Sequence, residues 1–119
     1  MITVFRNKSK FKFRKEIASI RIDNNSIYLS KAAVDLLSLN INVGEDSGGI
    51  YIANGKSKGE YTFKNRLGTN TVNLCNKDLA NKIRSVFGIK YTTPCMFNLD
   101  LKKAKDEYGS TWFKLTEIK

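Results

Sequence analysis

The chain has 119 residues, of which 41% are apolar and 27% are charged, so we expect one domain with its own hydrophobic core. Its 21 Lys and Arg residues outnumber the 11 Asp and Glu residues, and the net charge of +10 favours an anionic partner. The chain has no histidine, and its two cysteines, Cys75 and Cys95, are too far apart for a CxxC motif. These two facts exclude most classes of catalytic and metal-binding site, so we expect no metal and no cofactor.

No apolar run approaches the roughly 18 residues of a membrane-spanning helix, and no charged-then-apolar leader opens the chain. We therefore expect a cytoplasmic protein that makes no membrane contact. The two cysteines are expected to be buried free thiols rather than part of a zinc site or a redox motif.

Residues 1–15 form a distinct basic segment, which we call the arm. The arm contains six basic residues and no acidic residue, whereas the other 104 residues share only +4. Phe11 and Phe13 alternate with these cations, a period of two that is typical of a strand. We predict an N-terminal arm or strand, followed by a single α+β domain over 16–119. The cations of the arm are Arg6, Lys8, Lys10, Lys12, Arg14 and Lys15.

Short β-branched runs between turn residues predict a hairpin and then a helix. The hairpin has strands at 17–22 and 26–29, joined by a tight turn. Ser30 is the expected N-cap of the helix, because a serine hydroxyl accepts hydrogen bonds from the free backbone N–H groups of the first turn. The helix is expected to stop near Asn40.

Glycine-rich turn segments predict a second hairpin after an acidic loop. Its strands are expected at 49–54 and 60–65, with a turn through 55–59. Basic hairpin tips can contact the phosphates of a nucleic acid, although an ordinary solvated turn explains the same residues equally well. The basic residues at or just beyond this tip are Lys56, Lys58, Lys64 and Arg66.

The same order of elements returns in the second half. A strand at 71–75 precedes a helix capped by Asn76, and strands at 95–101 and 110–118 flank a polar turn that contains three lysines. The sequence thus divides into half-repeats at about 16–65 and 66–119, which predicts an internal duplication of a β-α-β-β unit, a pseudodimer. A small α+β domain can show the same order of strands and helices twice without duplication, and this alternative stays open.

We therefore predict an α+β fold, with a mostly antiparallel sheet of about seven strands and two short helices. Within 20–46, Leu29-Ser30-Lys31 opens the helix, Leu37-Ser38-Leu39 closes it and Gly44-Glu45 marks the next turn. This arrangement resembles the swapped-hairpin AbrB/MazE family of bacterial transition-state regulators and antitoxins. The resemblance implies a DNA-binding fold in which two hairpin-helix units intertwine, with 71–89 as the second unit.

These features predict a non-catalytic nucleic-acid-binding protein, a small DNA-binding regulator or accessory protein of a bacterium or phage. The arm and the basic tips would bind phosphates, with duplex DNA favoured over a single strand. Scattered carboxylates and the absence of a phosphate-binding loop argue against an enzyme. The alternative is a small interaction, inhibitor or assembly protein whose basic surface docks on an acidic protein partner. Either protein is expected to be a monomeric pseudodimer or a homodimer.

Overall fold

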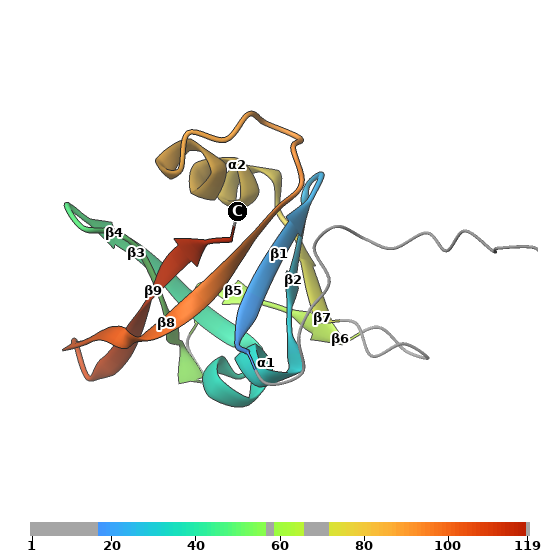
Figure 1. Cartoon of the computed structure of the whole chain (residues 1–119). Helices are drawn as coiled ribbons and strands as arrows, with labels where there is room; N and C mark the ends of the chain where they lie inside the picture. Colours follow the sequence, from blue (N-terminus) through green and yellow to red (C-terminus); the bar gives the residue numbers. More distant parts are fainter. Residues whose placement is uncertain (1–16, 57–58, 66–71, 119) are drawn as a thin grey trace, which may run out of the picture.

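Figure 1 shows the computed structural model, which describes residues 17–56, 59–65 and 72–118. The predicted arm lies outside the described residues. The α+β class, the antiparallel sheet and the two helices are confirmed, with nine strands rather than about seven. The elements are β1 (Ser19–Asp23), β2 (Ser26–Leu29), α1 (Lys31–Leu37), β3 (Asn40–Asp46), β4 (Gly49–Asn54), β5 (Tyr61–Thr62), β6 (Lys64–Asn65), β7 (Val72–Cys75), α2 (Lys77–Val86), β8 (Cys95–Glu107) and β9 (Ser110–Glu117).

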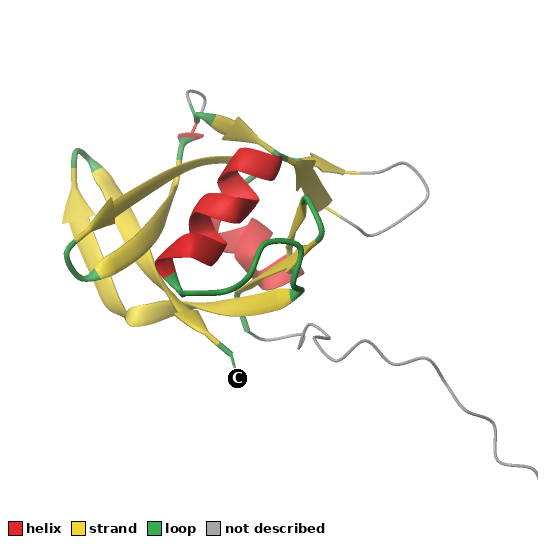
Figure 2. Cartoon of the chain, turned by 90° about the horizontal axis from the view of Figure 1, so that it is seen from above, coloured by secondary structure: helices red, strands yellow, loops and turns green. Residues whose placement is uncertain are grey.

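The nine strands form one antiparallel sheet in the order β5-β3-β4-β9-β8-β1-β2-β7-β6, which curls into a nearly closed barrel (Figure 2). Its two edge strands, β5 and β6, are separated in the chain only by Phe63, whose side chain is buried in the core. Residues 61–65 therefore run from one edge of the sheet to the other. Because both edge strands are only two residues long, the sheet offers little free edge for pairing with other chains.

The strand pairings interleave the two halves of the chain. Four of them join consecutive strands: β1–β2, β3–β4, β6–β7 and β8–β9. The other four, β1–β8, β2–β7, β3–β5 and β4–β9, each join a strand of 19–54 to a strand of 61–117. Among the described residues, neither half forms a sheet of its own, so each half completes the other.

The core follows from the alternation of apolar residues along the strands. Ile20 and Ile22 of β1 and Ile27 and Leu29 of β2 are buried inside the barrel, while the residues between them point outward. Helices α2 and α1 lie at opposite ends of the barrel (Figure 1) and contribute buried apolar side chains to the same core.

The predicted helix caps are confirmed. The Ser30 hydroxyl accepts a hydrogen bond from the backbone N–H of Ala33 at 3.2 Å, and the Asn76 side chain accepts one from Leu79 at 2.9 Å. Helix α1 ends at Leu37, slightly before the predicted end, because Ser38 adopts a φ of 65° that stops the helix.

The predicted second hairpin is wrong. Strand β4 pairs with β3 and β9, and residues 60–65 instead supply β5 and β6, which pair with β3 and β7. The glycines taken as turn residues serve close backbone packing. A Cβ on Gly55 would lie 2.3 Å from the Cα of Gly59, and a Cβ on Gly59 would lie 2.8 Å from the carbonyl carbon of Asn40. The predicted acidic loop is likewise the end of β3 and its short turn into β4.

The predicted polar turn in the second half is also wrong. Strand β8 continues to Glu107, with a register shift between Asp100 and Lys105, and the turn comprises only Tyr108 and Gly109. Both turn residues have positive φ, 53° and 74°, the signature of a type I′ turn. Polar residues form a strand here because the hairpin projects beyond the barrel (Figure 1), where β8 and β9 are paired with each other.

Candidate functional site

The structure describes two of the ten basic residues predicted at the site. Lys56 follows β4, and its Nζ donates a 3.5 Å hydrogen bond to the carbonyl of Gly109, so it lies beside the β8–β9 turn rather than at the tip of its own hairpin. Lys64 is exposed in the edge strand β6. The other eight lie outside the described residues: Arg6, Lys8, Lys10, Lys12, Arg14, Lys15, Lys58 and Arg66.

The second predicted basic tip does not exist as a turn. Lys102, Lys103 and Lys105 belong to β8, in and just after its irregular segment, and all three side chains are exposed or half exposed. Lys105 is engaged in an ion pair described below.

Charge is distributed unevenly along the chain. The described residues contain 12 of the 21 basic residues and 10 of the 11 acidic residues, a net charge of +2. The other 25 residues therefore carry +8 of the total +10. The described residues are close to neutral, and most of the excess positive charge lies in the arm, with single basic residues at Lys58, Arg66 and Lys119.

The chain enters the barrel through a hydrogen-bonded junction around Ser30. The Ser30 hydroxyl donates to the carbonyl of Ile17 at 3.2 Å and accepts from the backbone N–H of Ser19 at 2.9 Å. The Ser19 hydroxyl in turn donates to the Asn98 side chain at 2.9 Å. The junction ties the start of β1 to the start of α1 and to β8, so the arm is joined to the barrel at a fixed point.

A row of residues on the face of the sheet opposite the core crosses five strands next to this junction. Direct cross-strand partners place Met96, Arg21, Tyr28, Asn73 and Lys64 side by side on β8, β1, β2, β7 and β6. Met96 is buried, and the other four are partly or fully exposed. The Arg21 guanidinium lies over the Tyr28 ring, with its Cζ 4.6 Å from the ring centroid. Sheet faces that combine aromatic, amide and cationic side chains are suited to contacting bases and phosphates. We call these five residues the outer row.

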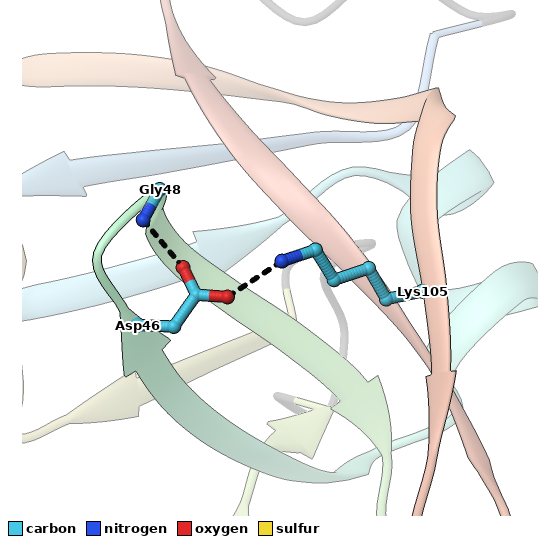
Figure 3. Close-up of polar contacts among 3 residues, drawn as sticks. All are labelled: Asp46, Gly48 and Lys105. Carbon is cyan, nitrogen blue, oxygen red and sulfur yellow. Dashed lines mark hydrogen bonds and ion pairs between the residues drawn. The ribbon is translucent and has the colours of Figure 1, made fainter.

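A second cluster joins the β3–β4 hairpin to the β8–β9 hairpin. Lys105 Nζ lies 2.6 Å from Asp46 Oδ2 and 4.9 Å from the centroid of the Tyr51 ring. The other oxygen of Asp46 accepts a 2.6 Å hydrogen bond from the backbone N–H of Gly48 (Figure 3). The hydrogen bond from Lys105 holds the pKa of the Asp46 carboxyl below 3.8, and the pairing raises the pKa of Lys105 above 10.5.

Trp112 of β9 lies next to this ion pair on the outer face. Its Nε1 donates a 3.1 Å hydrogen bond to the carbonyl of Glu107, and a Cβ on Gly44 would lie 3.3 Å from its ring. Tyr51, Trp112 and Tyr108, together with the ion pair and neighbouring carboxylates, line an open recess of about 130 Å³. We call it the hairpin recess.

Sequence reasoning did not identify the outer row or the hairpin recess. The alternation of apolar and polar residues in β1 and β2 indicates that Arg21 and Tyr28 face outward. Their alignment with Asn73 and Lys64 depends on pairings between distant strands. Trp112 and Phe113 are adjacent in β9 and face opposite sides of the strand, so Phe113 packs on the core and Trp112 lines the recess.

The two cysteines differ in exposure. Cys95 is buried, as expected, and burial raises the pKa of its thiol, an effect that nearby Arg84 partly opposes. Cys75 is exposed, which corrects the expectation that both would be buried. Among the residues that the structure describes, no group of three or more metal-ligating side chains is gathered in one place. Neither of the two described helices is long and apolar enough to cross a membrane.

No protein-family model, curated protein or solved structure matches the chain.

Proposed function

We propose that this is a non-catalytic nucleic-acid-binding protein whose arm binds phosphates, with duplex DNA as the ligand of the arm. The observation that carries the proposal is the separation of charge: the described residues have a net charge of only +2, while the arm alone has six basic and no acidic residues. Lys and Arg that neutralise phosphates release condensed counterions, and this supplies the sequence-independent part of nucleic-acid affinity.

The outer row supports the proposal because it lies close to the point where the arm is attached. The arm and Glu16 are followed by the Ser19–Ser30 junction, and Arg21 comes only two residues after Ser19 on the same face of β1. At roughly 3.3 Å per residue along a strand, Arg21 lies less than about 10 Å from Ser19 of the junction. A ligand held by the arm is therefore within reach of Arg21 and of Tyr28, its direct cross-strand partner.

We also infer an internal duplication. The order β-β-α-β-β describes β1-β2-α1-β3-β4, and it describes the second half when β5 and β6 are counted as one strand interrupted by Phe63. In this comparison β1 corresponds to β5 and β6 together, β2 to β7, and β3 to β8. The pairing β1–β8 then corresponds to β5–β3, and the pairing β1–β2 corresponds to β6–β7; all four pairings are present. The unit inferred here is β-β-α-β-β rather than the predicted β-α-β-β, and the halves divide between Asn54 and Tyr61 rather than near residue 65. The interleaving of the halves supports the resemblance to the swapped-hairpin AbrB/MazE family.

The proposal is tested by the fluorescence anisotropy of a labelled duplex DNA at three salt concentrations. The full chain is compared with a variant in which the six arm cations are replaced by Gln, with Lys64→Gln, and with Lys90→Gln as a matched control on an exposed loop. We expect a steep decrease of affinity with salt, a slope that becomes much shallower in the arm variant, a smaller loss for Lys64→Gln and no change for Lys90→Gln.

An unchanged salt slope in the arm variant would remove the arm from the interface. If the full chain does not bind duplex or single-stranded DNA even at low salt, the proposed function is wrong.

A further inference from the structure

We propose that the hairpin recess binds one unpaired nucleobase, preferentially one that carries an exocyclic amino group, stacked on the rings of Trp112 and Tyr108. This inference rests on the proposed function and adds to it a site for unpaired nucleic acid, distinct from the phosphate contacts of the arm.

The size and walls of the recess favour a single planar ring. Its volume of about 130 Å³ is well below the roughly 300 Å³ at which sites for drug-sized ligands begin. Three aromatic residues, Tyr51, Trp112 and Tyr108, contribute to its lining. Base–aromatic stacking is a general means of binding single-stranded nucleic acid, because every base has a π-face.

Two of these three rings are available to a ligand. The Tyr51 ring already has the Lys105 ammonium over its face at 4.9 Å, and this lysine is held there by Asp46. A cationic ligand would have to compete with Lys105, whereas a neutral base can stack on Trp112. The Trp112 ring is held by its hydrogen bond to Glu107 and lies over Gly44, where a Cβ would approach it to 3.3 Å, so little ordering is needed when a base binds.

Tyr108 is better explained by ligand contact than by folding. It occupies the first central position of a type I′ turn at a φ of 53°, where Asn, Asp and Gly are strongly preferred. Its side chain is 94% exposed, so its ring adds nothing to the core. An aromatic residue kept at a strained and exposed position beside an aromatic recess is suited to stacking on a ligand.

The polar rim of the recess indicates which base it prefers. The carboxylate of Asp46 is already engaged by Lys105 and Gly48, whereas the exposed Glu107 carboxylate has no hydrogen-bond partner among the described residues. A carboxylate accepts a hydrogen bond from the N4 amino group of cytosine, while thymine presents a carbonyl oxygen at that position. Lys56, beside the turn, is placed to neutralise a neighbouring phosphate.

The test uses Trp112 as a reporter, because it is the only tryptophan in the chain. The full chain is titrated with oligo(dC) and oligo(dT) of about eight nucleotides, and binding of the same labelled oligonucleotides is followed in parallel by anisotropy. We expect oligo(dC) to quench Trp112 emission and to bind several-fold more tightly than oligo(dT). Glu107→Gln should reduce this preference.

The decisive variant is Tyr108→Asn, which removes the ring but places a preferred residue in the type I′ turn, so the hairpin should fold at least as well. Loss of one stacking ring should weaken oligo(dC) binding about tenfold. Tyr91→Ala, at a second exposed tyrosine on the loop after α2, is the matched control and should change neither affinity nor quenching.

The outcomes separate the two proposals. If labelled oligo(dC) binds but leaves Trp112 emission unchanged, or if Tyr108→Asn binds with unchanged affinity, the base site is wrong and the proposed function stands. If quenching by an aromatic peptide matches that by oligo(dC), the recess is a protein-docking site and the base site is again wrong. If no nucleic acid binds at low salt, the proposed function fails, and the base site fails with it.

Discussion

The backbone N–H of Ser19 donates a 2.9 Å hydrogen bond to the hydroxyl of Ser30, and the backbone N–H of Ser30 donates one back to the carbonyl of Ser19 at 3.0 Å. The two residues are 11 positions apart, and both are buried. A proline at position 30 could adopt the φ of −68° of Ser30, but it would lack both the N–H and the hydroxyl that hold this junction.

Replacing Ser30 with alanine is expected to lower the free energy of unfolding by about 2–4 kcal/mol. Loss of the N-cap costs about 1 kcal/mol, and the buried N–H of Ser19 is left without its acceptor at a further cost of about 1–3 kcal/mol. Urea unfolding measures the change. Ser85→Ala, on the exposed side of α2, is the matched control and should stay within about 0.5 kcal/mol of the unsubstituted chain.

The ion pair between Asp46 and Lys105 predicts a defined pH dependence. Because the folded pKa of Asp46 lies below 3.8, its contribution to stability is present above pH 3.8 and is lost as the pH falls through the folded pKa. Because the folded pKa of Lys105 lies above 10.5, its contribution is present below pH 10.5 and is lost as the pH rises through the folded value.

The difference in unfolding free energy between the unsubstituted chain and Asp46→Asn should therefore be largest near neutral pH and should shrink in acid below the ordinary carboxyl range. It should also decrease with added salt, because the pair is solvent-exposed. Asp35→Asn, at an exposed position on α1, controls for the general loss of an acidic side chain. A difference that does not vary with pH would contradict the pairing in solution.

Arg84 is a fully buried guanidinium that ties α2 to the loop after it. Its Nε donates to the carbonyl of Thr93 at 3.0 Å and its Nη1 to the Asn81 side chain at 3.1 Å, while Nη2 has no hydrogen-bond partner in the described residues. Arg84→Ala should lower stability by about 3 kcal/mol, because it removes both bonds and leaves a cavity.

Arg84→Met should cost less than Arg84→Ala, because methionine refills the volume and removes the buried nitrogen that lacks a partner. Thermal or urea unfolding ranks the two variants, with Lys77→Ala on the exposed start of α2 as the control. The reverse ranking would contradict the packing role assigned to Arg84.

The unequal exposure of the cysteines predicts stepwise thiol reactivity. In the native protein at neutral pH, one thiol, Cys75, should react rapidly with an aromatic disulfide reagent, whereas Cys95 should react only on unfolding, since burial raises its pKa and blocks access. Cys75→Ser should abolish the fast phase. If both thiols of the native protein react rapidly with the reagent, the region around Cys95 opens readily.

Local signals in the sequence predicted the elements that depend on neighbouring residues. The β1–β2 hairpin and the Ser30 and Asn76 caps each depend on residues a few positions apart, and all are confirmed. Elements that depend on distant partners were not predicted. Gly55 and Gly59 have the composition of a turn, and only the position of β3 shows that these glycines serve close backbone packing.

In the candidate site too, features that depend on neighbouring residues were predictable and features that depend on distant residues were not. The concentration of positive charge in the arm is visible in the sequence alone. The hairpin recess combines Asp46 and Lys105, which are 59 positions apart, and its use of Trp112 depends on a register shift in β8 that no composition signal marks. The outer row likewise depends on the pairing of β2 with β7.

The interleaved pairing also determines how two copies of this chain can associate. Since four of the eight strand pairings join one half to the other, two chains that exchange their C-terminal halves would satisfy every pairing found in the single chain, with the hinge falling between Asn54 and Tyr61. Domain swapping would therefore cost no native contact outside the hinge. A closed single chain is favoured over the exchanged dimer only while the second half of the same chain is present at a higher effective concentration than that of a neighbouring chain. We expect refolding from concentrated solution to yield an entangled dimer that size-exclusion chromatography separates, and that dilution alone does not dissociate.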